Sequence, residues 1–136
     1  WRTKRLIRVP SIGSLMPLYA GTISKQHAQQ LVDACERADL FGAQYPVPSV
    51  PLNADVFDAY RYWQGPSWIN TNWLIADGLD RYGFSKQAQK IRSASLDMIA
   101  KHGCYEYFSP IDGSPAGAKD FSWTAALALD WLHEKY

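Results

Sequence analysis

The feature that most constrains the fold of this chain is a helical spacing of apolar residues, broken by strong stop signals. After Ser24, apolar residues recur three or four positions apart, at Ala28, Leu31, Val32, Cys35 and Ala38. This spacing places them on one face of an α-helix, and serine is a favourable residue at a helix N-cap. The pattern therefore predicts a helix that starts near Ser24.

Three further segments show the same spacing, and each begins at residues that favour a helix N-terminus. Their predicted starts are Ser67, within Gly65-Pro66-Ser67, then Ser85 and Asp120. Glycines at positions 83 and 103 are predicted to end two of these helices, and a shorter helix is predicted from Ser14 to Ala20. Helix–loop–helix units of roughly 35 residues indicate an all-α hairpin array such as a solenoid or toroid.

Two segments interrupt the helical pattern. Residues 42–53 contain three prolines, and we predict an extended, polyproline-like loop there. Residues 103–119 contain three glycines and two prolines, and we predict a loop with a turn at 111–113. Long ordered loops in a compact helical domain are often functional.

Charge and composition exclude several classes of protein. The chain has 136 residues, enough for one domain, and its formal net charge is +1. This near-balance argues against nucleic-acid binding and against a polybasic membrane anchor. Hydrophobic residues make up 47%, which excludes disorder. No apolar run approaches the roughly 18 residues that a membrane span requires.

The first residue and the two cysteines give expectations about the whole protein. Because the chain begins with Trp1 rather than methionine, we expect it to be part of a longer protein. Cys35 and Cys104 could pair, but a single possible bridge is no disulfide framework, so we expect reduced thiols and a cytoplasmic location.

Aromatic residues account for 14% of the chain, with 6 Trp and 8 Tyr against 5 Phe. Tryptophan and tyrosine combine an apolar body with a polar group, which suits half-buried surfaces and pockets. Two interpretations remain open on composition alone. Flat rings stack on the CH-rich faces of sugars, and they also fill ordinary cores.

The common motifs of phosphate, dinucleotide, serine-hydrolase and zinc sites are missing from the sequence. His27, His102 and His133 lie far apart on predicted helices, so we expect no metal site and no cofactor. Cys35 lies on an apolar helix face, where a core position is a better interpretation than a nucleophile.

Two local clusters could carry chemistry. Residues 60–70, YRYWQGPSWIN, bring four large aromatics together with arginine, glutamine and asparagine at a predicted helix start. This is the inventory of a sugar pocket, although aromatic packing at a helix entry explains it equally well. The second cluster, residues 105–108, places Glu106 between aromatic rings, where a carboxylate is partly desolvated; an exposed loop glutamate is the alternative.

Taken together, these clusters and their neighbours resemble the C-terminal part of glycoside hydrolase family 63. The matching segments are YWQGPSWINTNWLI at 62–75, HGCYEYFSP at 102–110, Gly113, KDFSWTA at 119–125, YPVPSVP at 45–51 and IGSLMPLY at 12–19. The bacterial branch that acts on mannosylglycerate and glucosylglycerate is most similar, and trehalases are more distant relatives. The ordered Y-W-x-G-P-x-W-x-N and F-S-W-T-A blocks make this resemblance specific.

The resemblance implies an (α/α)6 toroid, of which residues 1–136 would form the C-terminal third of the catalytic domain. Members of the family cleave an α-glycosidic bond with inversion, using one carboxylic acid and one carboxylate base. The base aligns with Glu106. The acid is an aspartate in an earlier motif, which this chain does not contain.

The resemblance also implies the sugar-binding residues. Trp63 and Trp68 would line the glycone pocket with Tyr62 and Gln64 close by, and Trp123 would form a wall near the base. Many relatives carry arginine where this chain has Gln64, so a fixed cation is lost and the exact sugar stays open.

The expected partners follow from this interpretation: a carbohydrate substrate, an α-glucoside or α-mannoside, and the remainder of the catalytic domain. We expect neither nucleic acid nor a membrane as a partner. An incomplete toroid exposes apolar helix faces, so the chain alone should be inactive and should self-associate. The alternative is a non-catalytic helical domain that binds carbohydrate or another protein.

Overall fold

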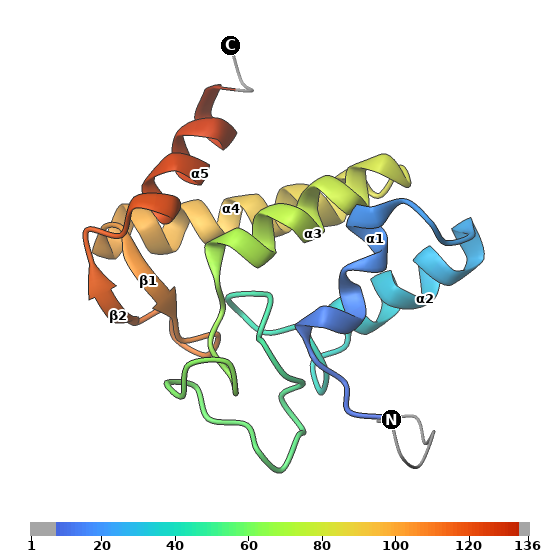
Figure 1. The fold of residues 1–136 in the computed structure, drawn as a ribbon, viewed down its shortest axis with the longest axis horizontal. Coiled ribbons are helices and arrows are strands. Elements are labelled where there is room, and N and C mark those ends of the chain that lie inside the picture. The colour runs from blue at the N-terminus through green and yellow to red at the C-terminus, as the bar shows by residue number, and fades with distance from the viewer. Residues whose placement is uncertain (1–7, 134–136) are drawn as a thin grey trace, which may run out of the picture.

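The computed structural model describes residues 8–133 of the chain (Figure 1). In chain order its elements are the 3-10 helix η1 (Ile12–Leu15), α1 (Pro17–Ala20), α2 (Lys25–Glu36), α3 (Ile69–Arg81), α4 (Ser85–His102), β1 (Tyr105–Phe108), β2 (Pro115–Lys119) and α5 (Ser122–His133). Every long element is a helix, as the periodicity predicts.

Helices α3 and α4 lie side by side and form the centre of the structure (Figure 1). Helix α1 packs closely on α3 at Gly78, where an added Cβ would lie 2.6 Å from the backbone of Leu18 and of Tyr19. The buried core runs from η1 through these helices, and its largest members include Leu15, Leu18, Ile69, Ile75, Leu79 and Met98. Glycine at position 78 therefore allows the backbones of α1 and α3 to approach.

The predicted helix starts are confirmed at two positions and are two residues early at two others. The hydroxyl of Ser24 accepts a hydrogen bond from the His27 backbone N–H at 3.2 Å, and α4 begins at Ser85. Helix α3 begins after Ser67 because the Ser67 backbone exchanges two hydrogen bonds with Phe108, which holds it extended. Asp120 has a left-handed backbone with φ of 57°, so α5 begins two residues later.

Residues 103–119 form a β-hairpin, which corrects the predicted loop. Strands β1 and β2 are antiparallel, with Tyr107 opposite Ala116 and Phe108 opposite Pro115. The predicted turn lies between the strands, where the Gly113 N–H donates to the Ser109 carbonyl at 3.0 Å. Alternating aromatic residues in β1 favour a strand. Gly103 caps α4, and the other glycines and prolines of the segment lie in the turn and in β2.

Residues 42–53 form a loop without helix or strand, as predicted, although bends at 44–45 and 49–50 and a turn at 52–53 interrupt its extended course. The loop lies beneath α3 (Figure 1). The fully buried amide of Asn72 holds this segment. Its Oδ1 accepts from the Val47 N–H at 2.8 Å, and its Nδ2 donates to the Pro46 carbonyl at 2.7 Å and to Ser95 Oγ at 2.9 Å. One side chain on α3 thus joins the loop to both central helices.

Within residues 8–133, none of the helices has the length and apolar character that crossing a membrane requires.

Candidate active site

Aromatic rings from three separate segments meet at the end of the molecule where the hairpin and the start of α5 lie. Trp63 stacks on Trp68, with ring centroids 4.1 Å apart. Trp68 in turn contacts Tyr107 of β1 at 4.8 Å and Trp123 of α5 at 6.0 Å. The three tryptophans therefore lie in one chain of ring contacts, although about 60 residues of sequence separate the outermost pair.

Trp68 is the buried centre of this aromatic platform, which we define as Tyr62, Trp63, Trp68, Tyr107 and Trp123. Its side chain is 1% exposed, while Trp63 and Trp123 are each 37% exposed. Only the outer rings can therefore present a flat face to a ligand from this chain. Trp68 supports them from behind.

The loop that carries Trp63 is held in an uncommon backbone conformation. Tyr62 has a φ of 43°, in the left-handed region that a tyrosine rarely occupies. Trp68 Nε1 donates a hydrogen bond to the Tyr62 carbonyl at 3.1 Å, and the Asp58 N–H donates to the Gln64 carbonyl at 2.8 Å. The first bond ties the loop to the platform, and the second closes the loop on itself. Strained positions that the surroundings hold in place often occur at functional sites.

Glu106 lies in β1, next to Tyr107 of the platform. Its Oε2 accepts a hydrogen bond from the Ala118 backbone N–H of β2 at 3.1 Å. Its Oε1 has no hydrogen-bond partner among residues 8–133. The carboxylate is half-buried, so one oxygen is anchored to the hairpin and the other is available to a ligand or a water.

Tyr107 connects the carboxylate to the aromatic rings. Its ring lies 5.8 Å from that of Tyr62 and 4.8 Å from that of Trp68. Burial, together with the negative charge of Glu106, raises the pKa of the Tyr107 phenol. The phenol therefore stays protonated at neutral pH and keeps its hydroxyl proton for donation.

The structure places the other predicted residues as follows. Gln64 lies in the loop between Tyr62 and the platform's buried centre, and its side-chain amide has no partner among the described residues. Three cavities of the described part lie at α2–α4, beside η1 and on α5, and Glu106 lines none of them. A closed pocket at Glu106 therefore stays a prediction for the whole domain.

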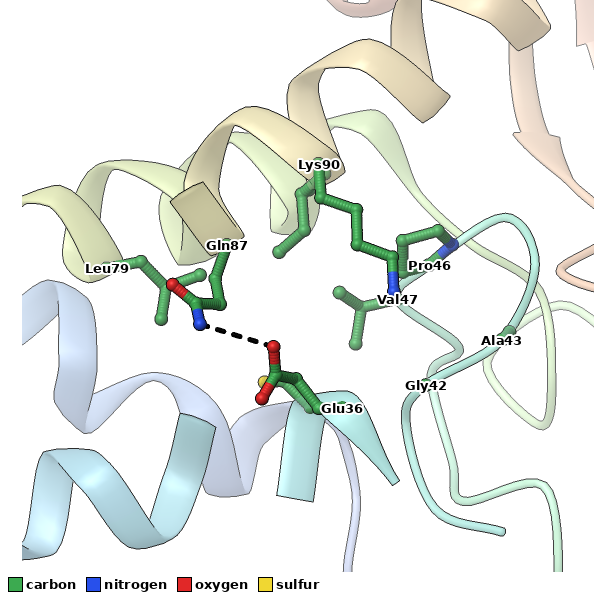
Figure 2. A pocket seen from close by; sticks show the side chains of 10 residues that line it. Glu36, Gly42, Ala43, Pro46, Val47, Leu79, Gln87 and Lys90 are labelled. Atoms are coloured by element: carbon green, nitrogen blue, oxygen red, sulfur yellow. Dashed lines mark hydrogen bonds between the residues drawn. The ribbon is translucent and has the colours of Figure 1, made fainter. Parts of the chain in front are cut away.

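The cavity at α2–α4 surrounds Cys35 and is too small for a sugar. It measures about 20 Å³, which is room for one water molecule. Figure 2 shows Glu36 of α2 and Gln87 of α4 facing each other there, with their side chains 3.2 Å apart in a hydrogen bond. Burial, and secondarily the charge of Glu36, raises the pKa of the Cys35 thiol to about 12. Cys35 is thus a core residue, as predicted.

The histidines lie apart on α2, α4 and α5. No group of three or more histidine, cysteine or acidic side chains within residues 8–133 is arranged to hold a metal ion.

Two features of the site are missed by sequence reasoning: the anchoring N–H of Ala118 and the close approach of Gly117 to Glu106. Both depend on the pairing register of the hairpin. If the two strands had been predicted, the position of Gly117 opposite Glu106 would have indicated both features.

Comparison with known proteins identifies the class to which this fold and site belong. The model of the mannosylglycerate hydrolase MGH1-like glycoside hydrolase domain matches residues 1–124. Mannosylglycerate hydrolase from Thermus thermophilus is 39% identical over 92% of this chain and 30% of its own length. Mannosylglycerate hydrolase MGH1 from Selaginella moellendorffii is 35% identical over 96% of this chain and 26% of its own length.

Solved structures agree. The crystal structure of a family 63 mannosylglycerate hydrolase from Thermus thermophilus in complex with glucose superposes with a TM-score of 0.89 at 39% identity, over 93% of this chain and 30% of the other. Neutral trehalase from Saccharomyces cerevisiae shares the fold with a TM-score of 0.72 at 21% identity, over 93% of this chain and 24% of the other. The chain therefore has the fold of part of an (α/α)6 toroid.

The chain belongs to glycoside hydrolase family 63, in its mannosylglycerate hydrolase MGH1-like branch. The predicted resemblance is confirmed. The chain spans less than a third of the length of these relatives.

Proposed function

We propose that residues 1–136 form the C-terminal third of the catalytic domain of an inverting α-glycosidase, with Glu106 as its general base. The observation that carries the proposal is the state of the Glu106 carboxylate: Oε2 is anchored by the Ala118 N–H at 3.1 Å beside the aromatic platform, and Oε1 has no hydrogen-bond partner among residues 8–133. A general base needs a fixed position and an unoccupied lone pair that faces the reacting water.

The proposed reaction needs two carboxyl groups on opposite faces of the sugar. Oε1 of Glu106 accepts a proton from a water, whose oxygen forms the new bond to the anomeric carbon. The glycosidic bond breaks, and its oxygen takes a proton from an aspartic acid in the part of the domain outside this chain. Inverting enzymes hold the two groups roughly 6.5–9.5 Å apart, which leaves space for the water.

The aromatic platform supports the assignment of the sugar-binding residues. Trp63 and Trp123 expose part of their rings beside the buried Trp68, and Tyr62 is more than half exposed. A pyranose that stacks on these faces would leave its hydroxyls for directional partners, and the side-chain amide of Gln64, next to Trp63 in the sequence, can serve as one. Trp68 then acts on the sugar through Trp63.

The relatives direct the choice of substrate. Proteins similar to this chain are named mannosylglycerate hydrolase, and one that is 36% identical over 72% of the chain is named glucosylglycerate hydrolase, from Mycolicibacterium hassiacum. We therefore propose an α-glucoside or α-mannoside substrate, with glucosylglycerate and mannosylglycerate first. The free thiols of Cys35 and Cys104 support a reducing, cytoplasmic location.

The test uses the full-length protein with glucosylglycerate, mannosylglycerate and trehalose as separate substrates. Proton NMR during the first turnovers reports the anomer of the released sugar before mutarotation. We expect a β-sugar from an α-linked substrate. Release of the α-anomer would show retention and contradict the proposal, and hydrolysis of none of the three would favour a non-catalytic binding domain.

A further inference from the structure

The strand opposite Glu106 contains one residue more than the strand that carries it. Tyr105 is opposite Lys119 and Tyr107 is opposite Ala116, and the register shifts between these two pairs. Glu106 therefore faces two residues of β2, Gly117 and Ala118, in a β-bulge. A bulge removes backbone groups from the ladder and re-aims them. Here the Ala118 N–H is aimed at Glu106 Oε2.

Gly117 has a φ of +74°, and it lies against the glutamate rather than in open space. A Cβ at this position would be 2.6 Å from Glu106 Oε2, 2.7 Å from Glu106 Cβ and 2.7 Å from Tyr107 Cε1. All three separations are shorter than van der Waals contact allows, so an added methyl group must displace a neighbour.

Of the three close atoms, only the carboxylate oxygen can move by rotation of its side chain, because Glu106 Cβ can move only together with the β1 backbone. The Tyr107 ring is packed between Trp68 and Tyr62 in the aromatic platform, at 4.8 Å and 5.8 Å. The Glu106 carboxylate is the end of a flexible side chain with one hydrogen bond to hold it. Any residue other than glycine would thus push Oε2 away from the Ala118 N–H.

We propose that the Gly117–Ala118 bulge is the positioning element of the catalytic base. The Ala118 N–H fixes Oε2, and the missing side chain of Gly117 gives the carboxylate its space, so that Oε1 alone faces the reacting water. This inference rests on the proposed role of Glu106. It assigns to Gly117 a function in catalysis in addition to the positive φ that its place in the bulge requires.

The experiment compares two substitutions at Gly117 with the same two at Gly83, all in the full-length protein. Gly83 is the matched control because its φ is +85° and an added Cβ there meets nothing within 4 Å. Alanine is strained at positive φ, while asparagine tolerates it. Both add the same Cβ, so the pair separates backbone strain from contact with Glu106.

We expect Gly117→Ala and Gly117→Asn each to lower kcat by about 100-fold, the effect of displacing a catalytic group by about 1 Å, while KM stays within about threefold. Gly83→Ala and Gly83→Asn should keep kcat within about twofold of wild type. If Gly117 served only to relieve backbone strain, its variants and the Gly83 variants would lose melting temperature and active fraction to a similar extent, and the remaining active protein would keep its kcat.

The outcomes separate this inference from the proposed function. If both Gly117 variants keep wild-type kcat while Glu106→Gln is inactive, the positioning role is wrong and the base assignment stands. If Gly117→Ala loses kcat and Gly117→Asn does not, strain is the cause and the positioning role is again wrong. If Glu106→Gln retains wild-type activity, the proposed function fails and the positioning role fails with it.

Discussion

Trp63 lies parallel to Trp68, with their ring centroids 4.1 Å apart and an angle of 3° between their planes. Trp68 is buried and Trp63 is at the surface, so Trp68 supports the pair and Trp63 is the ring that a sugar can contact. The buried ring fixes the plane on which a sugar would stack. The exposed ring provides its accessible face.

These two roles predict that substitution by alanine affects sugar binding at Trp63 and the stability of the fold at Trp68. Trp63→Ala should raise KM about two- to tenfold with little loss of stability, because it removes an aromatic contact worth roughly 0.5–1.5 kcal/mol. Trp68→Ala should lower the free energy of unfolding by about 3–5 kcal/mol, because it empties a core position. Steady-state kinetics and urea titrations of the full-length protein check both. Equal loss of stability in the two variants would contradict these two roles.

The Asn72 amide should be a main determinant of the position of the proline-rich segment. Asn72→Ala leaves the buried Val47 N–H without its partner, and an orphaned buried group costs about 1–3 kcal/mol. Asn53→Ala is the control, because Asn53 is exposed and its one side-chain bond, to Asp39, is 3.4 Å long. Denaturant unfolding should therefore show a clear loss for Asn72→Ala and almost none for Asn53→Ala.

The burial of the Cys35 thiol predicts that the free energy of unfolding falls at alkaline pH. Its pKa is about 12 in the folded protein against an ordinary value of 9.0, because burial disfavours the thiolate. Between these values the unfolded chain releases the proton and the folded chain keeps it, so this contribution to stability is complete below pH 9.0 and is lost as pH rises toward 12. Cys35→Ala should show a smaller decline over the same range in urea titrations.

The difference between the two pH profiles is the measured quantity, because lysines and tyrosines titrate in both proteins. Parallel profiles for wild type and Cys35→Ala would contradict the burial of this thiol. In the folded protein, a thiol reagent at pH 8 should also modify the half-buried Cys104 well before Cys35.

The exposed face of α5 should drive self-association of the isolated 136-residue chain. Leu129 is 67% exposed and Leu132 is 47% exposed on a helix that is otherwise mostly apolar. Analytical ultracentrifugation should show species above the monomer mass, and the double variant Leu129→Lys, Leu132→Lys should be monomeric. A wild-type chain that stays monomeric at high concentration would contradict this prediction.

The parts of the fold that were predictable are those decided by neighbouring residues. Ser24 caps α2 through its own hydroxyl, so a local pattern is sufficient. Ser67 resembles a helix start equally well, but its backbone pairs with Phe108, 41 positions away, and the helix begins later. Long-range pairing of this kind leaves no trace in local spacing.

The candidate site divides in the same way. The aromatic residues and Glu106 were identifiable because their side-chain chemistry is visible in the sequence. The contribution of Gly117 and Ala118 was not, because it consists of a backbone N–H and a missing Cβ placed by a shift of register. The glycine is visible in the sequence, but its place opposite Glu106 depends on the strand register, and a backbone N–H has no residue-type signature.

The most direct test of the central claim is the turnover number of the full-length Glu106→Gln variant. The amide matches the carboxylate in shape and cannot accept the proton of water, so kcat should fall by at least about 10²–10⁴-fold. Glu36→Gln is the matched control, because it makes the same change at an exposed carboxylate of α2, and α2 lies on the opposite side of the structure from the hairpin (Figure 1). Glu106→Gln should keep the wild-type melting temperature and the wild-type affinity for glucose. If it instead retains a tenth or more of wild-type turnover, Glu106 is not the general base.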